Sequence, residues 1–172
     1  MSNRNDKLVT EWYNIFRQYP DVFPDAYFRF LKANLMESAV KGTYFYKNGV
    51  LLTWKQYKKS TEHAKANDFS LEKMVSTNPG NGAAKTVMNK FLQTLPKEAT
   101  CYLKVAAHNA RAICFYKKNG FKTVKKIDFG GRIPGLLMRR KITNRPGAVA
   151  AASKDSTQLP RPLTRSVASP RP

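Results

Sequence analysis

The stretch of sequence that decides the fold is LKVAAHNARAICFYKKNGF, residues 103–121. Its apolar beginning predicts a strand, and Ala112 and Tyr116 recur at the spacing of an amphipathic helix that faces a sheet. Asn109 precedes this helix, where its side-chain oxygen can accept a hydrogen bond from a first-turn amide. Gly120 follows the helix, at the position where a left-handed residue often ends one. We therefore predict a strand, a helix and a second strand in succession.

The same residues resemble the strand–helix–strand segment of the GNAT superfamily of N-acyltransferases, whose pattern is N-x-x-A-I-x-F/L-Y-x-x-x-G-F. Here the pattern runs from Asn109 through Tyr116 to Phe121. The resemblance implies acetyl-CoA as the cofactor, with Asn109 among the residues that bind it, and acetyl transfer to an amine. It also implies that Tyr116 protonates the leaving thiolate, which suits a phenol with a pKa of about 10. A tyrosine packed against the sheet with its hydroxyl in water is the alternative interpretation.

A glycine-containing turn lies upstream, between a predicted strand over Phe69–Ser76 and a predicted helix that continues to about Gln93. Glycines let the backbone approach a phosphate, and the start of a helix presents free N–H groups. In the GNAT superfamily this place carries R/Q-x-x-G-x-G/A and holds the CoA pyrophosphate. Pro79 stands where the family has Arg or Gln. The resemblance implies that the cofactor contacts Val75, Gly80, Asn81, Gly82, Ala83 and Ala84.

The general base of the predicted site is defined by position alone. Glu72 lies on the predicted strand three residues before Val75, where some GNAT members place a glutamate that acts directly or through water. A glutamate exposed on the strand is the alternative interpretation. His108 precedes Asn109 and belongs to the residue type that titrates near neutral pH, but we interpret it as an incidental loop residue.

Composition limits the other classes of function. The chain has 172 residues, with 31 Lys and Arg against 11 Asp and Glu, and its formal charge of +20 favours anionic partners. Cys101 and Cys114 form no CxxC pair and the chain has only two histidines, so we predict no metal site. We expect both cysteines to be buried in a reducing compartment. Without a signal-like start or about 18 consecutive apolar residues, the sequence predicts a cytoplasmic protein with no membrane span.

The order of the predicted elements indicates a mixed α/β (α+β) fold over residues 1–142. We expect a GNAT-like, mostly antiparallel sheet flanked by helices, without the short first strand usual in the family. An Asn48-Gly49 turn between β-branched and aromatic runs predicts a hairpin. Phe30 is expected to face inward from the second helix. The predicted helices cover residues 6–17 and 24–40 besides those described above, and the later strands cover 100–107, 121–127 and 136–142.

Residues 143–172 form a second region of different composition. They are rich in Pro, Ala and Ser, contain scattered arginines and have no aromatic residue. Such a composition cannot bury enough apolar surface to form a core of its own. We therefore predict a basic, low-complexity C-terminal tail that is disordered or is ordered by a partner.

Two classes of function fit these patterns. The first is an acetyl-CoA-dependent N-acetyltransferase whose amine acceptor is a protein or a small molecule, and the basic charge favours an acidic acceptor. The second is a catalytically weakened GNAT-fold protein with a structural or assembly role, for example a phage virion component in the host cytoplasm or the virion. It would bind an anionic partner, nucleic acid or acidic protein, through its body and tail. A plain nucleic-acid binder is the third interpretation, although no RNA-recognition motif, helix-turn-helix or zinc ligand set is present.

Overall fold

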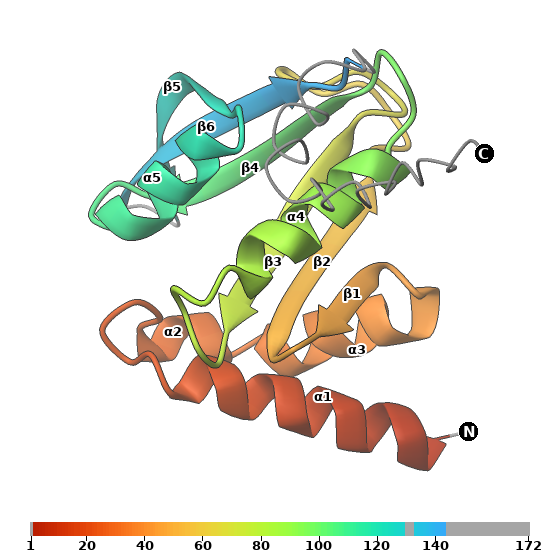
Figure 1. The fold of residues 1–172 in the computed structure, drawn as a ribbon, viewed down its shortest axis with the longest axis vertical. Coiled ribbons are helices and arrows are strands. Elements are labelled where there is room, and N and C mark those ends of the chain that lie inside the picture. The colour runs from red at the N-terminus through yellow and green to blue at the C-terminus, as the bar shows by residue number, and fades with distance from the viewer. Residues whose placement is uncertain (1, 130–132, 144–172) are drawn as a thin grey trace, which may run out of the picture. The chain divides into compact units, whose positions relative to one another are not determined.

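The computed structural model describes residues 2–129 and 133–143 (Figure 1). The predicted tail at 143–172 lies outside the described residues from position 144 onward. The described helices are α1 (Ser2–Arg17), α2 (Asp25–Phe28), α3 (Leu31–Lys41), α4 (Ala83–Thr94) and α5 (Ala110–Lys118). The described strands are β1 (Tyr44–Lys47), β2 (Val50–Gln56), β3 (Phe69–Ser76), β4 (Thr100–Ala106), β5 (Lys122–Phe129) and β6 (Ile133–Lys141).

The strands form one mixed sheet that is mostly antiparallel, which confirms the predicted fold class. Their order is β1-β2-β3-β4-β6-β5. Among the described strands only β3 and β4 pair in parallel, and every other neighbouring pair is antiparallel. The crossover between β3 and β4 contains α4, so the glycine turn before that helix lies at the end of β3 (Figure 1).

The β1–β2 hairpin confirms the prediction made at its turn. Asn48 and Gly49 both have positive φ, 51° and 71°, which is the combination that a two-residue type I′ turn requires. Lys47 pairs with Val50 directly across the turn. Position 49 also requires glycine for steric reasons, because a Cβ at this position would lie 2.0 Å from the Oγ1 of Thr77.

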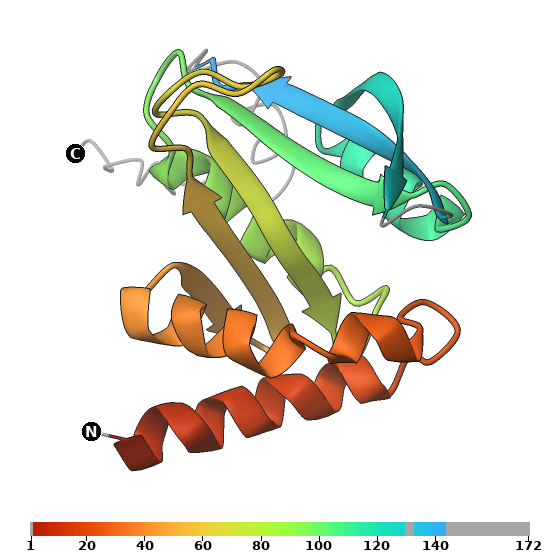
Figure 2. The same ribbon diagram turned by 180° about the vertical axis from the view of Figure 1, so that it is seen from behind.

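Helices pack on both faces of the sheet and bury two separate hydrophobic cores. On one face, α4 and α5 cover the strands and bury Phe91 and Tyr116. On the other face, α1 and α3 cover β2 and β3 and bury Trp12 and Leu35 completely; Figure 2 shows these helices from their own side. Removal of this apolar surface from water is the main stabilising contribution to the fold. No helix of the described residues combines the length and apolar character needed to cross a membrane.

The single helix predicted over residues 24–40 is wrong, because the chain forms two helices there. α2 ends at Phe28 and α3 begins at Leu31, and between them Phe30 has a φ of −114° and a ψ of 1°. On both sides of the break the apolar residues reach the same hydrophobic core. Tyr27 packs on Phe23 and Phe16, and Leu31 is buried against α1. Phe30 is left 63% exposed rather than inward.

The prediction that both cysteines are buried is right for Cys101 and wrong for Cys114. Cys101 lies on β4 in the core, where burial raises the pKa of its thiol to about 12. Cys114 is exposed on α5. It stands two residues after Ala112 and two before Tyr116, which places it on the opposite side of the helix from the stripe that packs on the sheet.

A buried carboxylate ties the start of β3 to the start of β4. Asp68 directly precedes β3 and is 7% exposed. Its Oδ1 accepts a hydrogen bond from the N–H of Thr100 at 2.9 Å, and its Oδ2 accepts one from the N–H of Lys65 at 2.8 Å. One side chain therefore joins the loop before β3 to the beginning of β4.

The change Asp68→Ala should lower the free energy of unfolding by about 2 kcal/mol, because two backbone donors lose their acceptor. Urea denaturation followed by circular dichroism measures this loss. The matched control is Asp21→Ala, an exposed aspartate between α1 and α2, which should change the stability by less than about 0.5 kcal/mol. Equal stabilities for the two variants would contradict the role assigned to Asp68.

Candidate functional site

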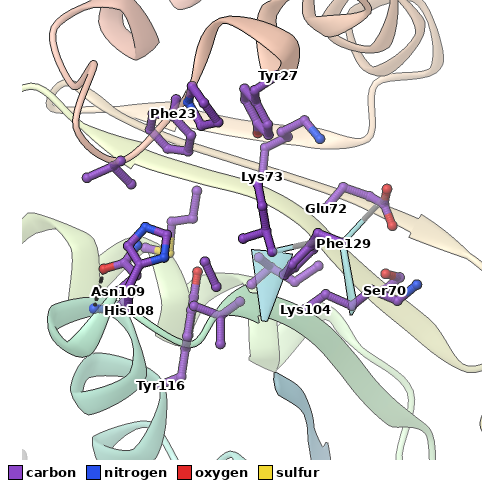
Figure 3. Close-up of a pocket in the computed structure, with 18 of the residues that line it drawn as sticks. Phe23, Tyr27, Ser70, Glu72, Lys73, Lys104, His108, Asn109, Tyr116 and Phe129 are labelled. Carbon is purple, nitrogen blue, oxygen red and sulfur yellow. Dashed lines mark hydrogen bonds between the residues drawn. The ribbon is translucent and has the colours of Figure 1, made fainter. Parts of the chain in front are cut away.

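A cleft of ≈ 510 Å³ opens where β3 and β4 separate (Figure 3). Residues 70–74 of β3 form one wall and residues 104–106 of β4 form the other. The segment from Val22 to Tyr27 lines a further side, and Ala112 and Tyr116 of α5 line another, together with Phe129 and Ile133. The cleft therefore gathers side chains that are far apart in the sequence.

The opening follows from a short parallel pairing. β3 and β4 pair from Phe69 opposite Cys101 to Leu71 opposite Leu103, whereas β3 continues to Ser76. In the described structure, the backbone groups of β3 that face β4 beyond this point have no ladder partner on that side. Backbone N–H and C=O groups need hydrogen-bond partners. A bound molecule that carries amides can supply them.

A β-bulge at Glu72 turns β3 away from β4. The partners of two adjacent β2 residues are Leu71 and Lys73, so Glu72 is the extra residue of the bulge. The bulge also reverses the face of the sheet toward which the odd-numbered side chains of β3 point. Leu71, before the bulge, packs with α4 and α5, whereas Val75, after it, packs with α1 and α3. The side chain of Val75 therefore belongs to the core, and its backbone is the part available to a ligand.

Tyr116 on α5 directs its hydroxyl into the cleft (Figure 3). Its ring packs edge-on against Phe115 and Phe121, and the residue is 8% exposed. Burial raises the pKa of its phenol well above the ordinary value, and the nearby Cys101 adds a smaller effect in the same direction. Tyr116 is therefore protonated at neutral pH and can donate a hydrogen bond into the cleft.

Asn109 caps the N-terminus of α5, as the sequence predicts. Its Oδ1 accepts a hydrogen bond from the N–H of Ala112 at 3.1 Å, drawn as a dashed line in Figure 3. The residue also lines the cleft, next to His108. Because the Oδ1 is engaged by the helix, the Nδ2 amide is the group that Asn109 can offer to a ligand.

The glycine turn forms where the sequence predicts it, between β3 and α4. Gly80 and Gly82 have φ values of 96° and 84°, which glycine adopts without strain. The Oδ1 of Asn81 accepts a hydrogen bond from the N–H of Ala83 at 3.0 Å. The first turn of α4 contains Lys85 and no acidic residue, the reverse of the charge pattern that stabilises a helix N-terminus. This charge pattern favours an anion at the turn.

Arg111 is a residue of the turn that sequence reasoning missed. A Cβ placed on Gly80 would lie 3.7 Å from the Nη2 of Arg111, so the guanidinium sits against the glycine turn. Arg111 comes from the first turn of α5, while Ala83 and Ala84 begin α4. The only signal in the sequence was a basic residue shortly after Asn109, and nothing local connects that position with a turn before another helix.

The charged residues that line the cleft are mostly basic. They are Glu72 and three lysines, Lys55, Lys73 and Lys104. The Oε1 of Glu72 lies 3.1 Å from the Nζ of Lys55, and Figure 3 shows the carboxylate pointing away from the Tyr116 hydroxyl. The two residues predicted to be catalytic therefore line one cleft from separate walls. No group of three or more His, Cys, Asp or Glu residues in the described ranges is placed to hold a metal ion.

Comparisons with known proteins identify the fold. The sequence matches no protein-family model and no curated protein. Among solved structures, a GNAT-family protein from Desulfovibrio desulfuricans superposes with a TM-score of 0.60 at 9% identity, over 81% of this chain and 94% of that chain. A protein from Corynebacterium glutamicum, described as histone acetyltransferase HPA2 and related acetyltransferase, gives 0.58 at 16% identity, over 84% and 94%.

A third solved structure, a GNAT-family acetyltransferase from Bacillus cereus, superposes with a TM-score of 0.53 at 14% identity. The match covers 66% of this chain and 80% of that chain. At these identities the similarity concerns the fold. The chain therefore has the GNAT fold, which confirms the resemblance seen in its sequence.

The change Asn109→Ala should lower the free energy of unfolding by about 1 kcal/mol, because α5 loses its N-cap. Asn109→Asp keeps a side-chain acceptor and should retain most of the stability. Urea denaturation measures both variants, with Asn78→Ala, an exposed asparagine of the turn after β3, as the control. A wild-type stability for Asn109→Ala would show that the hydrogen bond to Ala112 contributes nothing.

Proposed function

We propose that this chain is an acetyl-CoA-dependent N-acetyltransferase that moves an acetyl group to the amine of a protein or a small molecule. The observation that carries the proposal is the cleft between β3 and β4, into which Tyr116 directs its hydroxyl. The GNAT fold supports the same class of reaction, because solved neighbours with this fold are acetyltransferases. Calorimetric titration of the full chain with acetyl-CoA tests the proposal, and saturable binding is the expected result.

The residues of the glycine turn fit the pyrophosphate of acetyl-CoA. Gly80 and Gly82 carry no side chain at two positions of the turn, and the start of α4 offers backbone N–H groups. Arg111 adds a guanidinium beside Gly80, which compensates for Pro79 at the family's Arg or Gln position. The unpaired backbone edge of β3 is suited to the amides of the pantetheine arm, as the GNAT resemblance implies. The Nδ2 of Asn109 is a further donor on the opposite wall.

The change Arg111→Ala should raise the Kd for acetyl-CoA about fivefold to tenfold, because the turn loses its cation. Arg111→Lys keeps a charge without the planar fork and should give an intermediate Kd. Calorimetric titration measures each value. Lys117→Ala removes a cation from the other end of α5 and should leave the Kd unchanged. Equal effects of Arg111→Ala and Lys117→Ala would show that general charge, rather than position, governs binding.

When bound, acetyl-CoA supplies a thioester whose carbonyl carbon accepts an amine nitrogen and whose sulfur leaves. The β3 backbone near Met74 lines the cleft and would hold the thioester in position, and correct positioning alone would lower the barrier substantially. Tyr116 would donate a hydrogen bond from its hydroxyl to the sulfur. The raised pKa of Tyr116 means that the phenol is protonated at neutral pH, so its hydroxyl is available as a hydrogen-bond donor.

We propose Glu72 as the general base for the acceptor amine. Its carboxylate belongs to the wall of the cleft but is paired with Lys55 and points away from Tyr116. We therefore expect Glu72 to take the proton through a water molecule rather than in direct contact with the amine. The bulge supports this assignment, because it places the side chain at the point where the strands separate.

The change Tyr116→Phe should lower kcat about 100-fold while the Kd for acetyl-CoA is unchanged, because only the transition state needs the hydroxyl. Release of free CoA, followed with a thiol reagent, measures kcat. Tyr46→Phe is the control, since the hydroxyl of Tyr46 on β1 donates to Glu11 outside the cleft. A kcat for Tyr116→Phe equal to that of Tyr46→Phe would remove Tyr116 from the mechanism.

An assembly role for the same fold is the second candidate. The observation that favours it is β5, which forms an edge of the sheet and exposes Lys122 and Lys126. Lys117 and Lys118 end α5 just before this strand. A basic surface of this kind attracts nucleic acid or an acidic protein. A wild-type chain that fails to bind acetyl-CoA but binds nucleic acid in a salt-dependent manner would favour this role.

A further inference from the structure

Lys73 is a charged side chain of the cleft that has no part in the proposed transfer. Lys73 follows the bulge in β3 and is half-buried. Figure 3 shows its side chain extending toward Tyr27 of α2, on the side of the cleft away from α5. The Nζ of Lys73 lies 5.1 Å from the centroid of the Tyr27 ring.

No carboxylate neutralises Lys73 within 4.0 Å in the described part of the chain. The neighbouring Glu72 is paired with Lys55 instead. Tyr27 cannot act as the counterion, because burial raises the pKa of its phenol far above neutral and keeps it uncharged. Its ring face attracts the ammonium but leaves the positive charge without a negative partner.

A half-buried ammonium without a counterion is unfavourable. Burial lowers the pKa of Lys73; the adjacent Glu72 opposes this effect and Lys55 adds to it. A charge that is removed from water needs an opposite charge or hydrogen-bond partners to offset the loss of hydration. An anion that enters the cleft would provide them. Lys104 also lines the cleft and is exposed, so it favours a negatively charged ligand as well.

We propose that the amine acceptor carries a carboxylate and that Lys73 binds it. The inference rests on the proposed acetyl transfer, since it names the acceptor class for the same cleft. The amine lies toward Tyr116, while the carboxylate lies on the α2 side of the cleft beside the ammonium of Lys73. The carboxylate can belong to a small amino acid or to the acidic first residue of a peptide, and both place a carboxylate a few bonds from a primary amine.

The test compares amines in matched pairs that differ only in the charged group, with the full chain and acetyl-CoA. One arm pairs β-alanine with β-alaninamide and γ-aminobutyrate with its amide. The other arm pairs tetrapeptides that begin with Asp or Glu with tetrapeptides that begin with Asn or Gln. In at least one arm, kcat/KM should favour the carboxylate member about tenfold to hundredfold. The arm that shows the preference identifies the source of the carboxylate.

Substitutions at Lys73 separate recognition from general charge. Lys73→Met should remove the preference, Lys73→Glu should reverse it, and Lys73→Arg should retain it. None of the three should alter the Kd for acetyl-CoA, because the side chain of Lys73 extends toward Tyr27 and away from α5, which supplies Arg111 to the glycine turn. The matched control is Lys47→Met on the exposed end of β1, which should keep the full preference.

The outcomes distinguish the proposed acceptor class from the proposed acetyl transfer on which it rests. A chain that binds acetyl-CoA but gives equal rates within every pair, zero rates included, overturns the acceptor class and leaves the donor site in place. A preference that survives Lys73→Met overturns the role of Lys73. A wild-type chain that does not bind acetyl-CoA overturns the proposed function itself.

Discussion

The short pairing between β3 and β4 is the constraint on which the rest of the structure depends. Parallel strands that continue side by side satisfy each other's backbone groups, but here the pairing ends at Leu71 and Leu103. The bulge at Glu72 then turns β3 away, while Asp68 holds the paired ends of the two strands together. The two strands are therefore held together at one end of the cleft and separated at the other, and the walls carry backbone groups that can form hydrogen bonds with a ligand.

Positive charge is placed at two points beyond the pairing of β3 with β4, and each placement has a local cause. Arg111 reaches the glycine turn from α5, and Lys73 extends toward Tyr27 from the residue after the bulge. A formal charge of +20 attracts anions of every kind from a distance. Only side chains held in position discriminate among them, so the cleft, rather than the net charge, defines which anionic groups this chain is suited to bind.

Elements whose signals lie within a few residues were predictable. The Asn48-Gly49 turn and the cap at Asn109 depend on backbone conformation and side-chain chemistry at the positions themselves. The helix over 24–40 was predicted as one element because its apolar periodicity continues across the break. Tyr27 and Leu31 pack into the same hydrophobic core, yet the helix ends at Phe28 and a new one begins at Leu31. Cys114 was misassigned because an apolar residue on a helix was taken to share its buried stripe.

The sequence by itself determined the strand–helix–strand segment around Asn109, the glycine turn before α4 and the order of elements along the chain. These follow from periodicity and turn chemistry, which act between near neighbours. Only the tertiary structure decided that Arg111 lies against Gly80 and that Glu72 pairs with Lys55. It also decided that Lys73 lines the cleft with no carboxylate of the described residues within 4.0 Å. Such contacts depend on strand register and on where two strands separate, and register is set by pairing between segments that are far apart in the sequence.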